Sequence, residues 1–272
     1  MSSFSVLTNQ GAMIALQSLQ KTNKMLDVTQ QRITTGLKVN GPKDDASSYT
    51  IAQRMRGTVA GNESVKIALA NGDSVVNTAV EAGKSIADLL TDMKAKVVQA
   101  NQAGLDSSSR SALQQDFDAL RQQVATIVAS ASFNSTNLID VSSTTFTVLS
   151  TQDGSTITVS AQKMDTTTLG IVASDLTSSA NAATALTSIN SAIQIVADKL
   201  ATLGSSAKRI DVQTEFTGKL IDILKQGIGT LVDADLADES AQLQSLQIRQ
   251  QLGTQALSIA NQRPSSILSL FQ

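Results

Sequence analysis

No proline occurs between Pro42 and Pro264, and this absence strongly limits the possible folds of the chain. Proline is the residue that breaks a helix interior, so nothing in this stretch forbids a long helix. Within that stretch, apolar residues recur three and four positions apart, the spacing that turns one helical face toward a partner helix. Residues 51–100 carry this pattern unbroken, enough for a helix of about 75 Å at 1.5 Å per residue. The chain therefore folds around long paired helices.

Four more segments follow the same spacing. Residues 186–231 hold an apolar residue at twelve of fourteen seam positions. Residues 113–131 follow a break at Gly104 and a capping residue, Asp106, and are expected to fold back on the helix before them. The chain ends, residues 12–37 and 236–260, have interrupted seams. The expected fold is mainly α: an elongated antiparallel helical bundle or coiled coil, with the N- and C-terminal helices paired.

The interrupted terminal seams indicate helices that need more neighbours than a single chain of this length supplies. Ile248, Leu252 and Ile259 lie off the seam, and a helix that is apolar on more than one face requires several neighbours. The amides Asn23 and Gln30 lie on the first seam, either as tolerated polar residues or as residues that select the register of a bundle. We expect the seam residues of both ends to carry self-assembly: Leu16, Leu19, Leu26, Ile33, Leu243, Leu246 and Leu257.

Between the helical segments the period changes to two. Phe146 and Val148 alternate with threonine, Asp153-Gly154 follows, and Ile157 and Val159 alternate with threonine again. This pattern predicts a β-hairpin near residues 144–161 with Val148 opposite Val159. The Ser/Thr-rich stretches 141–145 and 166–181 are predicted to be exposed connections.

The residue content argues against enzymatic chemistry. The chain has no histidine and no cysteine, so it cannot form a Ser-His-Asp triad, a Cys-His pair or an ordinary zinc site. No phosphate-binding glycine motif is present, and no cofactor is expected. The formal net charge is −2, which favours neither nucleic acid nor membrane as a partner, and no segment reaches the roughly 18 apolar residues of a membrane span. No ordinary signal peptide is expected either.

Two acidic groups have a structural interpretation. Asp44 and Asp45 stand directly before a helix, where cap and dipole stabilisation is favoured over general acid–base chemistry. The run Asp233, Asp235, Asp238 and Glu239 lacks the spacing of a calcium loop and is interpreted as a turn that caps the last helix.

The chain ends also resemble a known family. Residues 32–57 read RITTGLKVNGPKDDASSYTIAQRMRG, which is similar to the Arg-Leu-Ser-Ser-Gly, Ile-Asn and Lys-Asp-Asp-Ala signature of bacterial flagellins. Residues 232–271 resemble the last helix of that family, including its Ala-Asn-Gln, its proline and its Leu-Ser-Leu ending. The matching motif residues are Arg32, Gly36, Asn40, Asp44, Asp45, Asn261 and Pro264.

The resemblance implies a structural subunit, not an enzyme, that is secreted and polymerises with itself into the extracellular filament of the bacterial flagellum for swimming. It implies a terminal assembly domain (residues 1–45 and 232–272, an inner tube) and a rod domain (residues 46–231) without outer variable domains. The implied partners, besides the homopolymer, are the type III export apparatus, a chaperone, and the hook-associated junction and cap proteins. The alternatives are a hook-filament junction protein, a flagellin with an enzymatic insert, or an unrelated coiled-coil secretion or pore protein.

A further implication concerns an innate immune receptor of vertebrates. In recognised flagellins the long helix carries a segment similar to Leu-Gln-Arg-Val-Arg-Glu-Leu-Ala-Val, which matches residues 90–98 here. The contacting Arg and Leu are replaced by Asp92 and Lys96, and the contacting Glu of the next helix matches Asp116. The resemblance therefore implies weak or absent recognition by that receptor.

Overall fold

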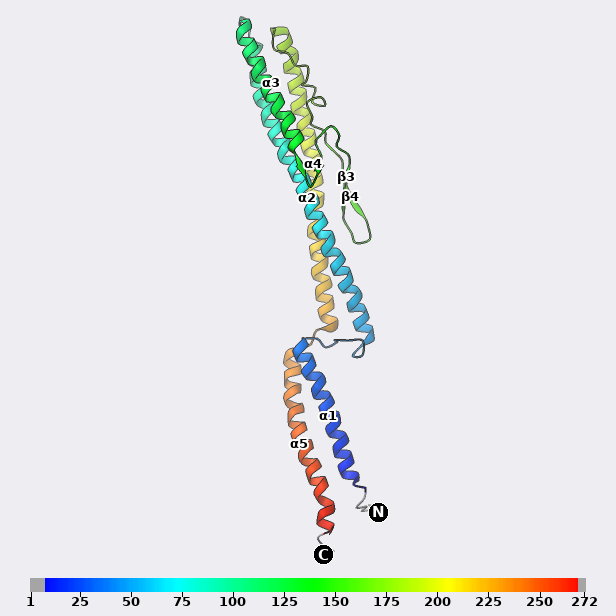
Figure 1. The fold of residues 1–272 in the computed structure, drawn as a ribbon. Coiled ribbons are helices and arrows are strands. Elements are labelled where there is room, and N and C mark those ends of the chain that lie inside the picture. Colours follow the sequence, from blue (N-terminus) through cyan, green and yellow to red (C-terminus); the bar gives the residue numbers. More distant parts are fainter. Residues whose placement is uncertain (1–7, 269–272) are drawn as a thin grey trace. The chain divides into compact units, whose positions relative to one another are not determined.

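The computed structural model describes residues 8–268 and the side chains of residues 8–262. The described chain is mainly α, as predicted, with short antiparallel strand pairs between its helices (Figure 1). It forms two compact units: a bundle unit, Thr58–Asp222, and a terminal unit made of the described parts of Met1–Gly57 and Ile223–Gln272. In chain order, the elements are α1 Gln10–Thr35, α2 Ala46–Ala100, α3 Ser107–Ser130, β1 Ser132–Phe133, β2 Thr136–Asn137, β3 Phe146–Leu149, β4 Thr156–Val159, α4 Ser179–Val232 and α5 Leu236–Leu268.

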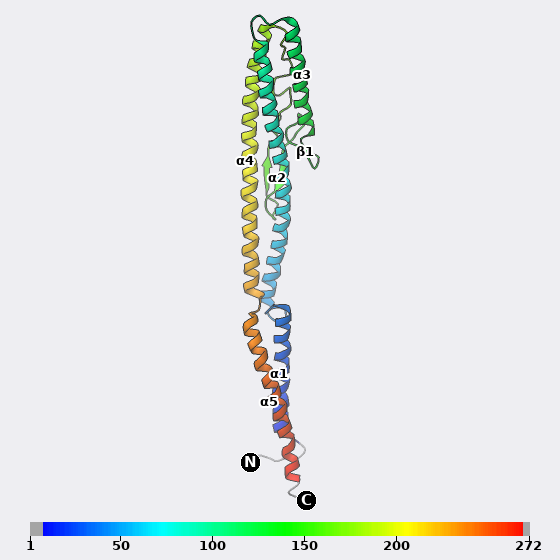
Figure 2. The same cartoon turned by 90° about the vertical axis from the view of Figure 1, so that its left-hand side faces the viewer.

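The core of the bundle unit lies along the predicted seam of α2. Every predicted seam position of α2 from Asn62 to Ala100 is buried. In the bundle unit α3 folds back beside α2, and α4 runs along both (Figure 2). The N-cap of α3 is Asp106, whose side chain accepts from the Ser109 N–H at 2.6 Å. The three-helix packing therefore follows from the spacing of small and apolar residues.

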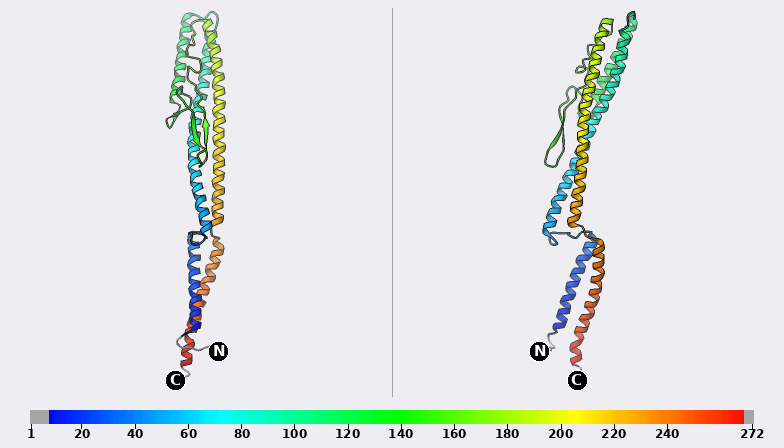
Figure 3. Two further views of the ribbon diagram at one scale, coloured as in Figure 1. Left: turned by 90° about the vertical axis from the view of Figure 1, so that its right-hand side faces the viewer. Right: turned by 180° about the vertical axis from the view of Figure 1, so that it is seen from behind.

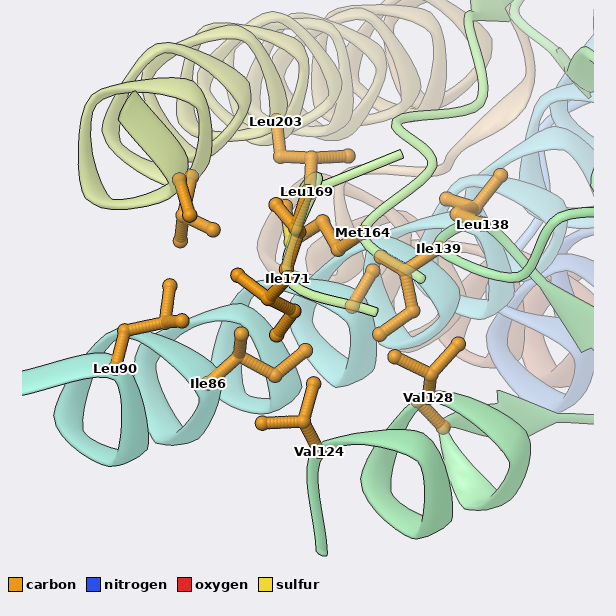
Figure 4. Close-up of a cluster of buried hydrophobic side chains, with 14 of the residues drawn as sticks. Ile86, Leu90, Val124, Val128, Leu138, Ile139, Met164, Leu169, Ile171 and Leu203 are labelled. Carbon is orange, nitrogen blue, oxygen red and sulfur yellow. The ribbon is translucent and has the colours of Figure 1, made fainter. Parts of the chain in front are cut away.

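The connection between β4 and α4 buries four apolar side chains, three of them within residues 166–181, a stretch that the sequence predicted to be exposed and that is exposed at most other positions. Met164, Leu169, Ile171 and Leu176 are each at most 1% exposed. Figure 4 shows Met164, Leu169 and Ile171 among side chains of α2, α3 and α4. The prediction was wrong at Leu169, Ile171 and Leu176 because isolated apolar residues among Ser and Thr show no period. The carboxylate of Asp165 accepts from nearby backbone N–H groups, which helps the connection satisfy its backbone as it packs inward.

The hairpin between β3 and β4 forms, but its predicted register was wrong. Val148 pairs with Ile157, and Val159 pairs with Phe146. The loop is longer than the two residues Asp153-Gly154, because Ser150 N–H donates to Ser155 O at 2.8 Å and Gly154 alone takes a positive φ of 92°. A shift of two residues keeps the same side chains on the inner face, so Val148 and Val159 are still buried.

The hairpin packs on α2 at a glycine. A Cβ atom added to Gly72 would lie 2.5 Å from Val148 Cγ2 and 2.9 Å from its Cγ1. A second close approach occurs at Gly61, where an added Cβ would lie 2.8 Å from Gln152 Oε1. The missing side chains of these glycines therefore let β3 and its loop approach the helix.

One carboxylate in the bundle unit is expected to make stability depend on pH. Partial burial, and then the nearby Asp211, raise the pKa of Asp73. A raised folded-state pKa means that the folded state holds the proton more tightly, so this contribution to stability falls as pH rises above about 4. Asp73→Asn is therefore expected to raise the melting temperature near pH 7 and to change it little near pH 3, as followed by circular dichroism.

Asp211→Asn is the matched control, because Asp211 is only the second cause of that shift. It should give a smaller gain at neutral pH. An equal effect of Asp73→Asn at both pH values would contradict the assignment.

Candidate assembly site

The terminal unit is built on two antiparallel helices, α1 and α5, which lie side by side (Figure 3). α1 ends at Gly36, which adopts a φ of 71° and donates its N–H to Arg32 O at 2.8 Å. The backbone then pairs with the chain after α4, since Lys38 N–H donates to Val232 O at 2.7 Å and Ala234 N–H to Gly36 O at 2.9 Å. These bonds join the connection that follows α1 to the connection that precedes α5.

A small apolar cluster lies at this junction. Val39, Ala52 and Val232 are at most 4% exposed there. The sequence placed Ile51 on the seam of α2, but Ile51 is 46% exposed and its neighbour Ala52 is buried. The seam changes phase because the first turns of α2 pack against the connection through Val39.

Most motif residues of the first signature hold this connection together. The carboxylate of Asp44 accepts from the N–H groups of Asn40 at 3.0 Å and Gly41 at 3.1 Å. Asp45 caps α2, as predicted, by accepting from Ser47 and Ser48 N–H. The hydrogen bond from the Ser48 hydroxyl is the main cause that lowers the pKa of Asp45. The signature therefore encodes a turn between two helices.

The acidic run before α5 contains a cap and an ion pair. Asp235 accepts from Ala237 N–H at 2.9 Å and so caps α5, as predicted. Glu239 is 8% exposed and receives a hydrogen bond from Arg32 Nη1 at 2.9 Å. Its second oxygen, Oε2, is buried without a hydrogen-bond partner among the described residues. Arg32 is thus the group that compensates a buried carboxylate.

The seam between α1 and α5 buries little apolar surface. Thr29, Glu239 and Leu246 are the buried residues of the two helices within the described side chains. Leu246 is 2% exposed and Leu16 is 45% exposed, whereas the other predicted assembly residues are partly buried: Leu19, Leu26, Ile33, Leu243 and Leu257. Asn261 is exposed, and Pro264 lies within α5 with its side chain outside the described part. This pair alone gains little from apolar burial.

Polar contacts cross the same seam. Asn9 Nδ2 donates to Ala260 O at 2.7 Å, and Gln250 Nε2 donates to Asn23 Oδ1 at 2.9 Å. Both seam amides, Asn23 and Gln30, are exposed, but Asn23 contacts the partner helix. Together with the ion pair between Arg32 and Glu239, these contacts are distributed along the length of the two helices.

The outer faces of α1 and α5 expose large apolar side chains. On α5 the sequence had identified Ile248, Leu252 and Ile259, which are 58–60% exposed. On α1 it had missed an equivalent set, although Met13 and Ile14 directly follow the seam residue Ala12 and could have been noticed. The full set of large exposed apolar residues on the two helices is Met13, Ile14, Leu16, Met25, Val28, Leu236, Ile248, Leu252 and Ile259, called here the outer apolar face.

The predicted receptor positions belong to the bundle unit. Asp92 is exposed on α2, and Lys96 Nζ contacts Asp116 Oδ2 of α3 at 2.7 Å. Two of the three positions therefore bind each other.

Within residues 8–268, no cluster of three or more His, Cys, Asp or Glu residues could hold a metal ion. None of the helices in the same part of the chain is both long and apolar enough to cross a membrane. What the described chain presents is paired helices with a row of exposed apolar side chains. These features define a structural, helical self-association protein.

Comparison with known proteins specifies the class. A model of the bacterial flagellin N-terminal helical region matches residues 6–144, and one of the bacterial flagellin C-terminal helical region matches residues 186–271. Flagellin FljK of Caulobacter vibrioides is 46% identical over 269 residues, covering 98% of both chains. A flagellin of Brucella melitensis is 37% identical over 281 residues, covering 98% of this chain and 99% of its own. The chain belongs to the bacterial flagellin family.

Solved structures agree with this fold. Flagellin of Bacillus cereus matches with a TM-score of 0.50 and 26% identity, over 54% of this chain and 86% of that one. A putative flagellar hook-associated protein of Vibrio parahaemolyticus matches with a TM-score of 0.58 at 11% identity, over 70% of this chain and 100% of that one, and so shows likeness of fold alone. The full-length flagellin relatives decide the function: the chain is a structural subunit that self-assembles into the flagellar filament, outside the cell.

Proposed function

We propose that the α1–α5 pair is the part of this filament subunit that carries its assembly, through the outer apolar face. On this proposal the inner tube of the filament is built from residues 1–45 and 232–272, and residues 46–231 form a rod domain without outer domains. The seam residues hold the pair together within one chain, whereas the outer apolar face meets neighbouring copies. The subunit acts by packing alone and has no catalytic role.

The observation that supports this proposal is the contrast between the two faces of the pair. The seam buries one large apolar side chain, Leu246, among the described residues, while the outer apolar face leaves nine of them between 37% and 63% exposed. Full burial of such a side chain is worth about 1.5–3 kcal/mol. Covering the outer apolar face would thus gain on the order of 10 kcal/mol per subunit, comparable to the stability of a whole domain.

Leu252→Asp tests the outer apolar face directly. Leu252 is 59% exposed, so aspartate should leave the helical content of the monomer unchanged. In a filament, the carboxylate would be transferred into an apolar contact, which is unfavourable. The critical concentration for polymerisation, measured by sedimentation, is expected to rise at least about tenfold.

Gln247→Asp is the matched control, because it adds the same charge at an exposed polar position of α5. It should change the critical concentration much less. Equal polymerisation of Leu252→Asp and the native chain would refute the proposed role of this face.

Export and its partners extend the same proposal. A terminal pair with few buried apolar residues opens at low cost, which suits transit through the type III export apparatus as an unfolded chain. The absence of cysteine leaves nothing to cross-link on the way. A chaperone that covers the outer apolar face before export, and the hook-associated junction and cap proteins that meet it afterwards, are the expected partners.

Weak recognition by the innate receptor is the last part of this proposal. An interface arranged for an arginine and a leucine would meet the reversed charge of Asp92 and an ammonium at Lys96 that is already paired with Asp116. Purified monomer should activate receptor reporter cells weakly, and Asp92→Arg with Lys96→Leu should increase the activation. The control is Asp88→Arg, a charge reversal at another exposed position of α2. Potent activation by the native monomer at low concentration would disprove this prediction.

A further inference from the structure

The α1–α5 pair is complementary in its polar side chains as well as in shape. α1 contributes the amide of Asn23 and the guanidinium of Arg32, and α5 contributes the amide of Gln250 and the carboxylate of Glu239. Each contact measures 2.9 Å, and together they define one antiparallel register. The side chain of Glu239 is only 10% exposed, so its charge is largely withdrawn from solvent.

Polar groups in a helical seam favour one partner over others more than they stabilise the pair. A buried ion pair contributes less stability than well-packed apolar residues, but it penalises any pairing that leaves one of its charges without a partner. Discrimination between partners rests on such penalties. The seam of α1 and α5 is poor in buried apolar residues, so these penalties are large relative to the stabilisation from apolar burial in the seam.

The competing pairs are homotypic, formed when two copies of the subunit meet. α1 carries the cations Lys21, Lys24 and Arg32 and a single carboxylate, Asp27, so two α1 helices repel each other and leave Arg32 without its carboxylate. Two α5 helices would leave Glu239 without Arg32, and its Oε2 already lacks a hydrogen-bond partner among the described residues.

We propose that Arg32 and Glu239 are specificity residues of assembly, which make α1 pair with an α5 and prevent pairs of two α1 or two α5 helices. Arg32 with Glu239 excludes the wrong pairs by charge, because either homotypic pair separates the guanidinium from the buried carboxylate. The inference rests on the proposed role of the α1–α5 pair in assembly. It identifies the residues that select the partner helix, in addition to the residues that drive association.

A disulfide can report the correct pair, because the chain has no cysteine of its own. A Cβ atom added to Gly253 would lie 3.8 Å from Leu19 Cβ, the spacing found in disulfides. Full-length Leu19→Cys with Gly253→Cys should therefore form an intrachain disulfide in mild oxidant, seen as a monomer band on a non-reducing gel. Adding Arg32→Glu should slow the formation of this disulfide about tenfold. Adding Glu239→Arg to the same chain should restore the rate of disulfide formation to within about twofold of the original.

A second disulfide reports the homotypic pair of two α1 helices. Full-length Leu19→Cys alone forms a covalent dimer only where two α1 helices meet. Arg32→Leu should speed this dimer at least about fivefold, because it removes the cation that two α1 helices leave without its carboxylate. Gln30→Leu is the control: it adds the same side chain at an exposed position of α1 and should have little effect.

The two reporters separate this inference from the proposed function. Leu252→Asp should raise the critical concentration for polymerisation without changing either disulfide, since Leu252 lies on the outer apolar face. An intrachain disulfide that Arg32→Glu does not slow, or that the exchanged pair does not restore, would overturn the role of the charges. A covalent dimer rate unchanged by Arg32→Leu would overturn the exclusion of α1 pairs.

Discussion

Leu246→Asp is expected to abolish filament formation. Leu246 is the buried apolar anchor of the α1–α5 pair, at 2% exposure, and a carboxylate in its place would cost several kcal/mol in a seam with little other apolar burial. The bundle unit should be unaffected because Leu246 lies outside it. Electron microscopy and motility in soft agar should show loss of filaments and of swimming, while circular dichroism retains the main thermal transition.

Deletion of residues 236–272 should reproduce this loss, since it removes α5 entirely. Leu257→Asp, at a partly buried seam position nearer the chain end, should have a milder effect. Normal filaments formed by the deletion variant would show that assembly does not depend on α5.

Gly72→Ala is expected to destabilise the bundle unit, although alanine is the better helix former. The new methyl group would lie 2.5 Å from Val148 Cγ2, too close for any real contact, so β3 would have to move away from α2. Overpacking of this kind costs typically 1–3 kcal/mol, against about 1 kcal/mol gained in helix propensity. The hairpin has no second sheet to hold it, so the clash should prevail and lower the melting temperature by several degrees.

Gly204→Ala is the control of opposite sign. Gly204 lies in α4, and an added Cβ there meets no atom within 4 Å. The same substitution should therefore stabilise by about 1 kcal/mol. Gly72→Ala with Val148→Ala should recover part of the loss. If both glycine variants were stabilising, β3 would not be packed on Gly72.

The helices of the bundle unit were predictable because their period directly reports burial. From Asn62 to Ala100 every seam residue of α2 is buried, even at Gly72, where the partner is β3 and not a helix. Prediction failed where an irregular connection takes part in the packing. Ala52 replaces Ile51 as the buried residue because it meets the connection after α1, and Leu169 and Ile171 are buried in a segment that has no period at all.

The candidate site was predictable only in part, for a related reason. Seam positions such as Leu246 follow from spacing within one helix, but the cross-helix contacts of Arg32 and Asn23 depend on register, which a single helix does not specify. The outer face of α5 was found because Ile248 and Leu252 interrupt a polar background. The predicted hairpin pairing failed similarly, since loop length and not alternation sets it.

The contacts of the terminal unit also determine when it can form. Arg32 and Glu239 are 207 residues apart in the chain, and Asn23 and Gln250 are 227 residues apart, whereas Lys96 and Asp116 are separated by only 20. Contacts between distant residues carry a larger loop-closure entropy and form slowly, and local ones form fast. The α2–α3 hairpin can therefore fold as soon as its own residues are free, but α1 must wait for nearly the whole chain. The topology thus sets the order of folding: α1, the helix that is synthesised first, is the last to find its partner helix.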